Sequence, residues 1–282
     1  MLRMAKQFLA AGLIAFAGLL SAHAADLAEP PVVESPPPPM EFGGWYIRGD
    51  LDYHWSDFRG ADYITYGVCV DPCGAVAVPG SNSFSSGDLG GAFSLGGGVG
   101  YQITPYLRTD LTADYWFSSD FDGSTADDVS VSTDTSSYSA WLLLANAYAD
   151  LGTYYGFTPY VGAGIGGAYV KWDDLHNTIG DVTTVHEGAS NWRFAWALMA
   201  GTAYCLTGNL KLDVGYRYTR INGGEMFGLA PDGPGGAGPG YDNGFNVHEA
   251  RAGLRYSFGN SGCVPPPVPV AYEPPAPEPV YK

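Results

Sequence analysis

Basic residues and long apolar runs are both scarce in this chain of 282 residues. There are 13 Lys and Arg against 29 Asp and Glu, and only 15% of the residues are charged. An acidic balance of this size excludes nucleic acid as a partner, because nucleic-acid binding needs a basic surface. After residue 24 no run of about 20 apolar residues occurs, which excludes a transmembrane helix. Strands of a β-barrel are then the remaining way across a bilayer.

Residues for metal or covalent chemistry are sparse as well. The four histidines after residue 24, at positions 54, 176, 186 and 248, lack metal-ligand spacing. The glycine run from Gly162 to Gly167 resembles a nucleotide-binding loop, but no helix follows it, and alternating glycines fit a crowded barrel wall. We expect no enzyme, no metal and no cofactor, with His248 as the one weak candidate for catalysis.

The first 24 residues have the layout of a secretory signal peptide. Arg3 and Lys6 precede the apolar run 8–20, which is too short to span a bilayer, and Ser21-Ala22-His23-Ala24 supplies small residues for cleavage. We predict cleavage between Ala24 and Ala25. The mature chain then keeps 11 basic and 29 acidic residues, a net charge of −18.

Proline marks the boundaries of the folded part. Six prolines lie between Pro30 and Pro39, and eight lie between Pro265 and Pro279. Such segments form extended, solvated tethers. We therefore divide the chain into a signal peptide (1–24), a proline-rich linker (25–42), a β-domain (43–258) and a proline-rich tail (259–282).

Eight segments of the β-domain alternate between apolar and polar residues with a period of two. In the first, Trp45, Ile47 and Leu51 share one parity while Arg48 and Asp50 share the other, so that successive side chains point to opposite faces. Three connections are short (104–106, 152–157 and 207–209) and four are long, polar loops (58–88, 118–137, 173–190 and 222–244). This asymmetry is typical of outer-membrane barrels and predicts an all-β, eight-stranded antiparallel up-and-down transmembrane β-barrel.

Charged residues gather on the parity that faces the interior. We predict fifteen interior charges: Arg48, Asp50, Asp52, Arg108, Asp110, Asp114, Asp150, Lys171, Arg193, Lys211, Asp213, Arg217, Glu249, Arg251 and Arg255. Because an isolated buried ion is costly, these residues should pair and fill the narrow interior. A narrow water path through them is left open.

The first and last strands resemble those of a known family. Gly43-Gly44-Trp45-Tyr46-Ile47-Arg48-Gly49-Asp50 and the closing 248–258 segment are similar to the small surface barrels of α-proteobacterial outer membranes, in the opacity-protein and porin-like superfamily. The resemblance covers 43–258. It implies assembly by the barrel assembly machinery with the aromatic Phe258 as recognition element. In such proteins the last strand is commonly the C-terminus, whereas 24 residues follow it here.

The four cysteines suggest two disulfides in an oxidising envelope. Cys69 and Cys73 lie close together in the first long loop, where a metal-binding or redox pair is the alternative reading. Cys205 ends a strand and Cys263 follows the last strand, so a bond between them would hold the tail under the barrel.

The resemblance also bears on Ala25 and Asp26, because some α-proteobacterial barrels are joined to peptidoglycan through a mature Ala-Asp terminus. It implies Ala25 as the attachment point; an untethered terminus is the alternative. We expect a structural outer-membrane barrel, with a low-conductance porin or an adhesin (surface antigen) as alternatives. Its expected partners are outer-membrane lipid, lipopolysaccharide, the assembly machinery and peptidoglycan, with both termini in the periplasm.

Overall fold

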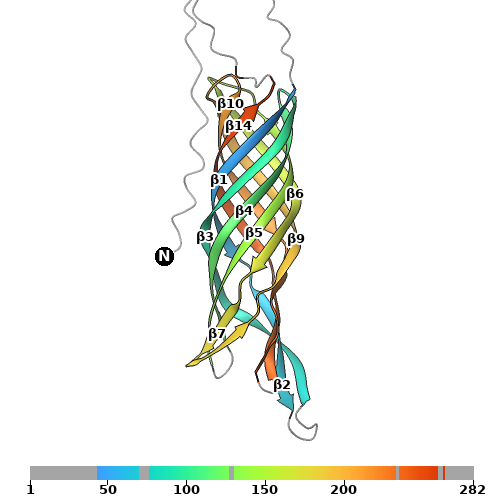
Figure 1. Cartoon of the computed structure of the whole chain (residues 1–282), viewed down its shortest axis with the longest axis vertical. Helices are drawn as coiled ribbons and strands as arrows, with labels where there is room; N and C mark the ends of the chain where they lie inside the picture. The colour runs from blue at the N-terminus through green and yellow to red at the C-terminus, as the bar shows by residue number, and fades with distance from the viewer. Residues whose placement is uncertain (1–42, 70–75, 127–129, 233–234, 260–262, 264–282) are drawn as a thin grey trace, which may run out of the picture. The chain divides into compact units, whose positions relative to one another are not determined.

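The computed structural model describes residues 43–69, 76–126, 130–232, 235–259 and 263 (Figure 1). The predicted alternation is present as antiparallel β-structure, which confirms the all-β class. The described residues contain fourteen strands: β1 (Gly44–Phe58), β2 (Ala61–Cys69), β3 (Val76–Thr104), β4 (Leu107–Thr125), β5 (Thr133–Asp150), β6 (Phe157–Trp172), β7 (Leu175–Ile179), β8 (Val182–His186), β9 (Ser190–Cys205), β10 (Leu210–Ile221), β11 (Gly224–Phe227), β12 (Ala230–Asp232), β13 (Gly235–Asp242) and β14 (Phe245–Ser257). Over the same residues, no helix has the length and apolar character needed to cross a membrane.

Eight of these strands pair in a closed ring. Its order is β1, β3, β4, β5, β6, β9, β10 and β14, and β14 pairs back with β1 from Tyr46↔Ser257 to Phe58↔Phe245 (Figure 1). All eight pairings are antiparallel. A closed ring has no unpaired edge, so the backbone polar groups of each strand are satisfied by its two neighbours.

The two faces of the ring follow the sequence pattern. On β1, Trp45 is 59% exposed and Leu51 is 54% exposed, whereas Asp50, Asp52 and His54 are buried. The other ring strands repeat this arrangement, with apolar and aromatic side chains outside. The ring therefore has an apolar outer face and an interior that contains its charges.

At one end of the ring, which we call the turn end, the connections are short. The β5–β6 turn uses Gly152 (φ +97°) and Gly156 (φ +86°), backbone conformations that favour glycine. Phe258 continues the β14–β1 pairing by donating its backbone N–H to the carbonyl of Trp45 (2.9 Å). Cys205 and Cys263 form the predicted disulfide here, with their Cα atoms 5.8 Å apart.

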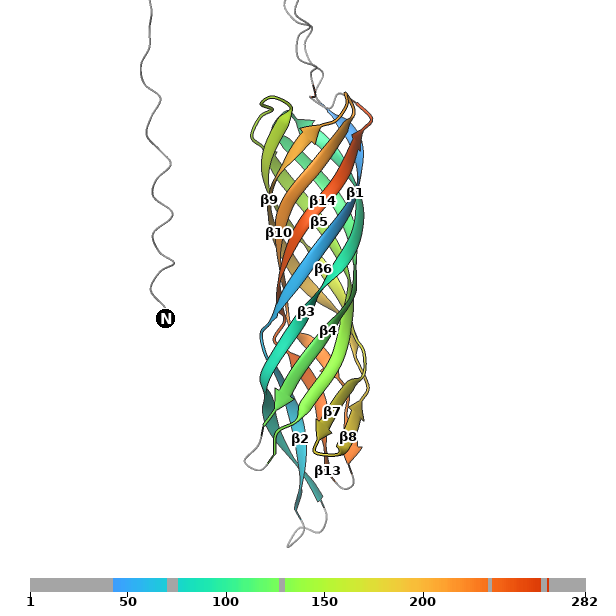
Figure 2. The same cartoon turned by 90° about the vertical axis from the view of Figure 1, so that its left-hand side faces the viewer.

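The opposite end, which we call the hairpin end, corrects the prediction of four long loops. Residues 58–88 contain β2 paired with the start of β3, and residues 173–190 contain the β7–β8 hairpin. β4 extends to Thr125, β5 begins at Thr133, and residues 222–244 contain β11, β12 and β13. Figure 2 shows β2, β7, β8 and β13 at this end of the molecule. The loop prediction was wrong because it relied on polarity. Strands in contact with water need no apolar outer face, so backbone pairing continues where the hydrophobic pattern stops.

Candidate functional site in the interior of the ring

Fourteen of the fifteen predicted interior charges are buried, each at most 7% exposed: Arg48, Asp50, Asp52, Arg108, Asp110, Asp114, Asp150, Arg193, Lys211, Asp213, Arg217, Glu249, Arg251 and Arg255. Lys171 is the exception, with a side chain that is 60% exposed and lies 3.7 Å from Asp173. Its assignment to the interior was wrong. β6 keeps a period of two up to Trp172, which is buried, so Lys171 has the outward parity of Ile165.

Arg217 on β10 is the centre of this interior. Its guanidinium is fully buried and faces three carboxylates. Nη1 donates to Asp114 on β4 (2.8 Å), Nη2 donates to Glu249 on β14 (2.7 Å), and Asp52 on β1 is 3.8 Å away. In the ring, β4 is the fourth strand from β10 in either direction. The Arg217–Asp114 ion pair therefore joins opposite walls.

A second guanidinium shares the carboxylates of the first. Arg251 donates through Nε to Asp52 (3.0 Å), and its Nη2 lies 3.3 Å from Asp50 and 3.6 Å from Asp114. Asp52 and Asp114 are also close to Arg217, and Asp50 is also close to Arg48. Each of these carboxylates therefore has two cationic neighbours, which compensates its buried charge.

The alternation of charges continues towards the turn end. Arg48 lies 2.7 Å from Asp50 and 3.2 Å from Asp110, and Arg108 lies 3.0 Å from Asp150. We call the connected set the ionic network: Arg48, Asp50, Asp52, Arg108, Asp110, Asp114, Asp150, Arg217, Glu249 and Arg251. Arg255 and Asp213 form a separate pair (3.2 Å), and Arg255 lies opposite Arg48 in the β1–β14 register.

Glycines in the wall make room for the larger interior side chains. A Cβ atom at Gly100 would collide with the ring of Tyr46, and one at Gly162 would collide with the ring of Tyr148. Tyr148 in turn accepts a hydrogen bond from Arg48 (3.3 Å). The glycine-rich strands are therefore part of the same packing as the ionic network.

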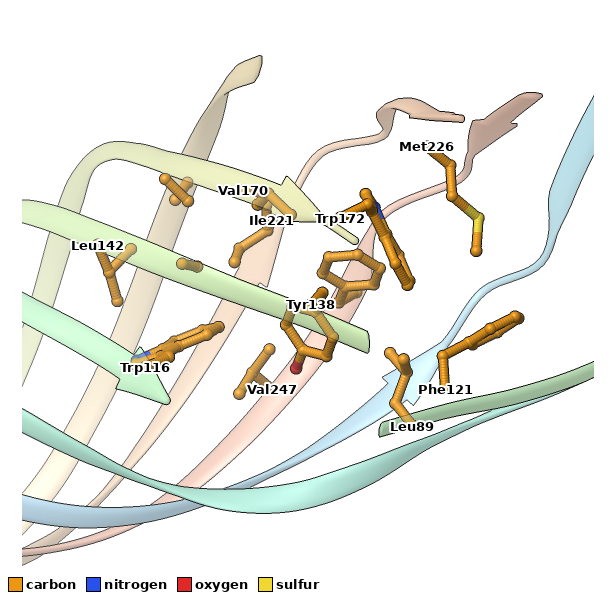
Figure 3. Packing of buried hydrophobic residues seen from close by; sticks show 14 of the residues in the cluster. Leu89, Trp116, Phe121, Tyr138, Leu142, Val170, Trp172, Ile221, Met226 and Val247 are labelled. Carbon is orange, nitrogen blue, oxygen red and sulfur yellow. The ribbon is translucent and has the colours of Figure 1, made fainter. Parts of the chain in front are cut away.

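Towards the hairpin end, the interior is filled by aromatic residues. We call Trp116, Phe121, Tyr138, Trp172 and Phe245 the aromatic plug; each is at most 1% exposed. The side chains of Tyr138 and Trp172 meet inside the ring among those of neighbouring strands (Figure 3), with ring centroids 5.4 Å apart. Tyr138 on β5 also lies 5.3 Å from Phe245 on β14, the fourth strand away in either direction. The plug therefore crosses the interior from wall to wall.

Asp242 belongs to this interior although the sequence reading placed it in a loop. Its carboxylate accepts hydrogen bonds from Arg193 (2.7 Å) and from the indole Nε1 of Trp172 (3.2 Å). It also accepts the backbone N–H of Gly244 (2.9 Å). The Asp-Asn-Gly sequence at 242–244 is the signal that could have marked an ordered turn here.

A pocket of about 190 Å³ lies at the hairpin end, with Tyr63, Asn177, His186 and Phe227 in its lining. Nearby Asp134 is fully buried and accepts a hydrogen bond from Ser132 Oγ (2.8 Å). Burial raises the pKa of Asp134 and lowers the pKa of His186, and both shifts favour the neutral forms. The lining residues of the pocket include no Asp, Glu, Lys or Arg.

The remaining predicted residues are placed as follows. His248 lies outside the ring, stacked on Trp55 and bonded to Tyr216, with Nε2 3.3 Å from Asp57. In the described part of the chain, no group of three His, Cys, Asp or Glu side chains is arranged to hold a metal ion. Ala24, Ala25, Asp26 and Cys73 lie outside the described residues, so the predictions for cleavage, wall attachment and the Cys69–Cys73 bond stay predictions.

A closed antiparallel ring with an apolar outer face and an ionic interior defines the class of outer-membrane β-barrel proteins. The family model for the outer membrane protein beta-barrel domain matches residues 12–258, and the chain belongs to this family. It resides in the outer membrane among the lipids.

The chain is similar to an uncharacterized protein of Brucella abortus (strain 2308), with 40% identity over 269 residues that cover 84% of this chain and 93% of that protein. Among solved structures, it is similar to Neisserial surface protein A (18% identity, TM-score 0.42, covering 76% of this chain and 97% of that one). It is also similar to OprG from Pseudomonas aeruginosa (14% identity, TM-score 0.42, covering 77% and 97%).

Proposed function

We propose that the protein is an eight-stranded, up-and-down transmembrane barrel that stabilises the cell envelope mechanically and does not act as a channel. The observation that carries this proposal is the contact between opposite walls at two levels of the interior. Arg217 and Asp114 meet in the ionic network, and Tyr138 and Phe245 meet in the aromatic plug. A solute that passed through would have to separate both pairs.

The orientation follows from the lengths of the connections. Short turns face the periplasm and longer extensions face outward in barrels of this kind. The turn end is then periplasmic, and we assign the proline-rich linker (25–42) and tail (259–282) to the same compartment. The disulfide between Cys205 and Cys263 supports this arrangement, because it holds the start of the tail at the turn end. Phe258, at the β14–β1 closure, is the residue that the barrel assembly machinery recognises.

The same proposal includes a covalent tether. After cleavage behind Ala24, the α-amine of Ala25 is joined to peptidoglycan, and residues 26–42 act as the spacer. At about 3.1 Å per extended residue, a proline-rich arm of this kind reaches several tens of ångströms. Mass spectrometry of muramidase-released wall fragments tests this directly: a muropeptide on the Ala25 amine supports the tether, and abundant protein with a free Ala25 amine and no such adduct overturns it.

A bacterium lacking the gene separates the three candidate functions. If the barrel is structural, deletion increases leakage of a periplasmic enzyme, and uptake of a small hydrophilic dye through the outer membrane is not reduced. A porin predicts slower dye uptake after deletion. An adhesin predicts weaker attachment to host cells with no leakage. Restoring the wild-type gene must reverse whichever effect is found.

A further inference from the structure

The cations of this acidic protein are distributed unequally between its two faces. Seven of the 11 basic residues that follow the signal peptide are buried in the interior: Arg48, Arg108, Arg193, Lys211, Arg217, Arg251 and Arg255. Three lie on the outside near the hairpin end: Arg59, Lys171 and Arg220. Lys171 has a carboxylate partner, Asp173. Among the described residues, neither Arg59 nor Arg220 has a carboxylate within 4.0 Å.

The two arginines without an acidic partner converge on one position. Arg220 on β10 donates through Nη2 to the backbone carbonyl of Asn243 (3.0 Å). Asn243 donates its own N–H to the carbonyl of Gly60 (2.9 Å), the residue next to Arg59. The carboxylate of Asp242 is paired with Arg193 at 2.7 Å, inside the ring. Asn243 therefore contacts both the guanidinium of Arg220 and the backbone next to Arg59, which brings these two residues together on the outside of the ring.

The strand register indicates the level of Arg220 relative to the bilayer. Tyr218, His248 and Trp55 form one row across β10, β14 and β1, and His248 packs on both aromatic rings, with centroids 5.4 and 5.8 Å away. Arg220 lies two residues further towards the hairpin end, which is about 6–7 Å along a strand. On β10, β14 and β1, the row of Arg220 is the first outward-facing row beyond this aromatic row, and aromatic girdles mark the edge of the hydrocarbon region. On these three strands it therefore lies at the level of the lipid head groups.

We propose that Arg59 and Arg220 bind the phosphate group of a phosphorylated glycolipid in the outer leaflet, of the lipid A type. Guanidinium groups suit this ligand because their planar donors bind phosphate oxygens in pairs. The sugar ring that carries the phosphate lies against the aromatic row of Trp55 and Tyr218. The inference rests on the proposed orientation, in which the hairpin end faces outward.

The carboxylate of Asp57 opposes this binding. Asp57 lies in the same row as Arg220, across Asn246, and its side chain is 66% exposed. Its Oδ2 is 3.3 Å from Nε2 of His248, so it is directed towards that ring. A divalent cation bound to Asp57 is another way to hold a phosphate. The experiment must therefore separate direct binding by the arginines from binding through such a cation.

Native mass spectrometry of the full-length protein in detergent, with a chelator present, measures retained lipid. The probes are bisphosphorylated lipid A, enzymatically dephosphorylated lipid A and phosphatidylglycerol. We expect wild type to retain bisphosphorylated lipid A at least tenfold more than the dephosphorylated form and more than phosphatidylglycerol. The variant Arg59→Gln/Arg220→Gln should lose this preference. Lys171→Gln, which removes an outer cation already paired with Asp173, should keep it.

Several results would overturn the site. The first is equal retention of bisphosphorylated lipid A by wild type and the double glutamine variant. The second is that wild type retains dephosphorylated lipid A or phosphatidylglycerol as strongly as bisphosphorylated lipid A. The third is that wild type retains bisphosphorylated lipid A only when the chelator is left out. Heat-modifiable migration in gels checks that each variant is folded. The variant Arg59→Lys/Arg220→Lys keeps the charge but loses the paired donors, so it should retain bisphosphorylated lipid A at an intermediate level. The assay does not depend on conductance or on the wall tether, so failure of this site and failure of the proposed function are separate outcomes.

Discussion

Between the turn end and the hairpin end, the interior changes from the ionic network around Arg217 to the aromatic plug around Tyr138 and Phe245. Both regions fill the same ring of strands and both join opposite walls. They differ in what holds them together. Each ion of the network depends on a specific partner, whereas the plug depends on shape and on the exclusion of water. The two regions should therefore respond differently to the loss of one side chain.

The largest effect is expected for Arg217→Met. The substitution leaves Asp52, Asp114 and Glu249 near one another without the cation that faces all three. Breaking a buried ion pair by removing one partner costs about 3–5 kcal/mol. Reversible urea unfolding in lipid vesicles should show this loss in the free energy of unfolding. A change below about 1 kcal/mol would contradict a central role for Arg217.

Phe245→Ala probes the plug and should be nearly as destabilising. Phe245 is fully buried and packs on Tyr138 and Trp172, with ring centroids 5.3 and 5.8 Å away. Truncating a buried Phe to Ala costs about 3–5 kcal/mol through lost burial and the cavity left behind. Unlike Arg217→Met, this loss should be partly recovered by Phe245→Leu in the same assay. If leucine restores nothing, shape alone does not explain the plug.

A smaller effect, dependent on pH, is expected at His186 beside the hairpin-end pocket. Burial lowers the pKa of His186 below its usual value, so the folded state favours the neutral ring. The unfolded chain then binds more protons, and stability should fall as the pH drops below about 6.5. His186→Asn should reduce this slope. Asp134, whose pKa is raised by burial, acts in the opposite direction at lower pH, so the comparison is made between pH 7 and pH 5.5.

The smallest effect is expected for Lys171→Gln. Its side chain and that of Asp173 are 60% and 55% exposed, and exposed ion pairs contribute about 0–1 kcal/mol. The free energy of unfolding should stay within that range of wild type. A loss comparable to that of Arg217→Met would mean that burial is not what separates the two kinds of ion pair.

The two regions also differ in how far the sequence predicts them. Parity along single strands identifies the inward charges of the ionic network, because period-two alternation is a local property. It does not identify which charge meets which: the Arg217–Asp114 pair joins residues 103 positions apart. Of the aromatic plug, Phe121 falls in a predicted loop (118–137), because strands at the hairpin end leave the apolar pattern. Asp242, which is essential to the contacts of Arg193 and Trp172, was missed for this reason.

Single-channel recording of the purified full-length protein in planar lipid bilayers tests the central claim most directly. If the ionic network and the aromatic plug close the interior, the wild-type protein should insert without producing steady unitary current steps. Reproducible unitary conductance from folded wild-type protein would contradict the account, because ions would then cross the levels at which Arg217 meets Asp114 and Tyr138 meets Phe245.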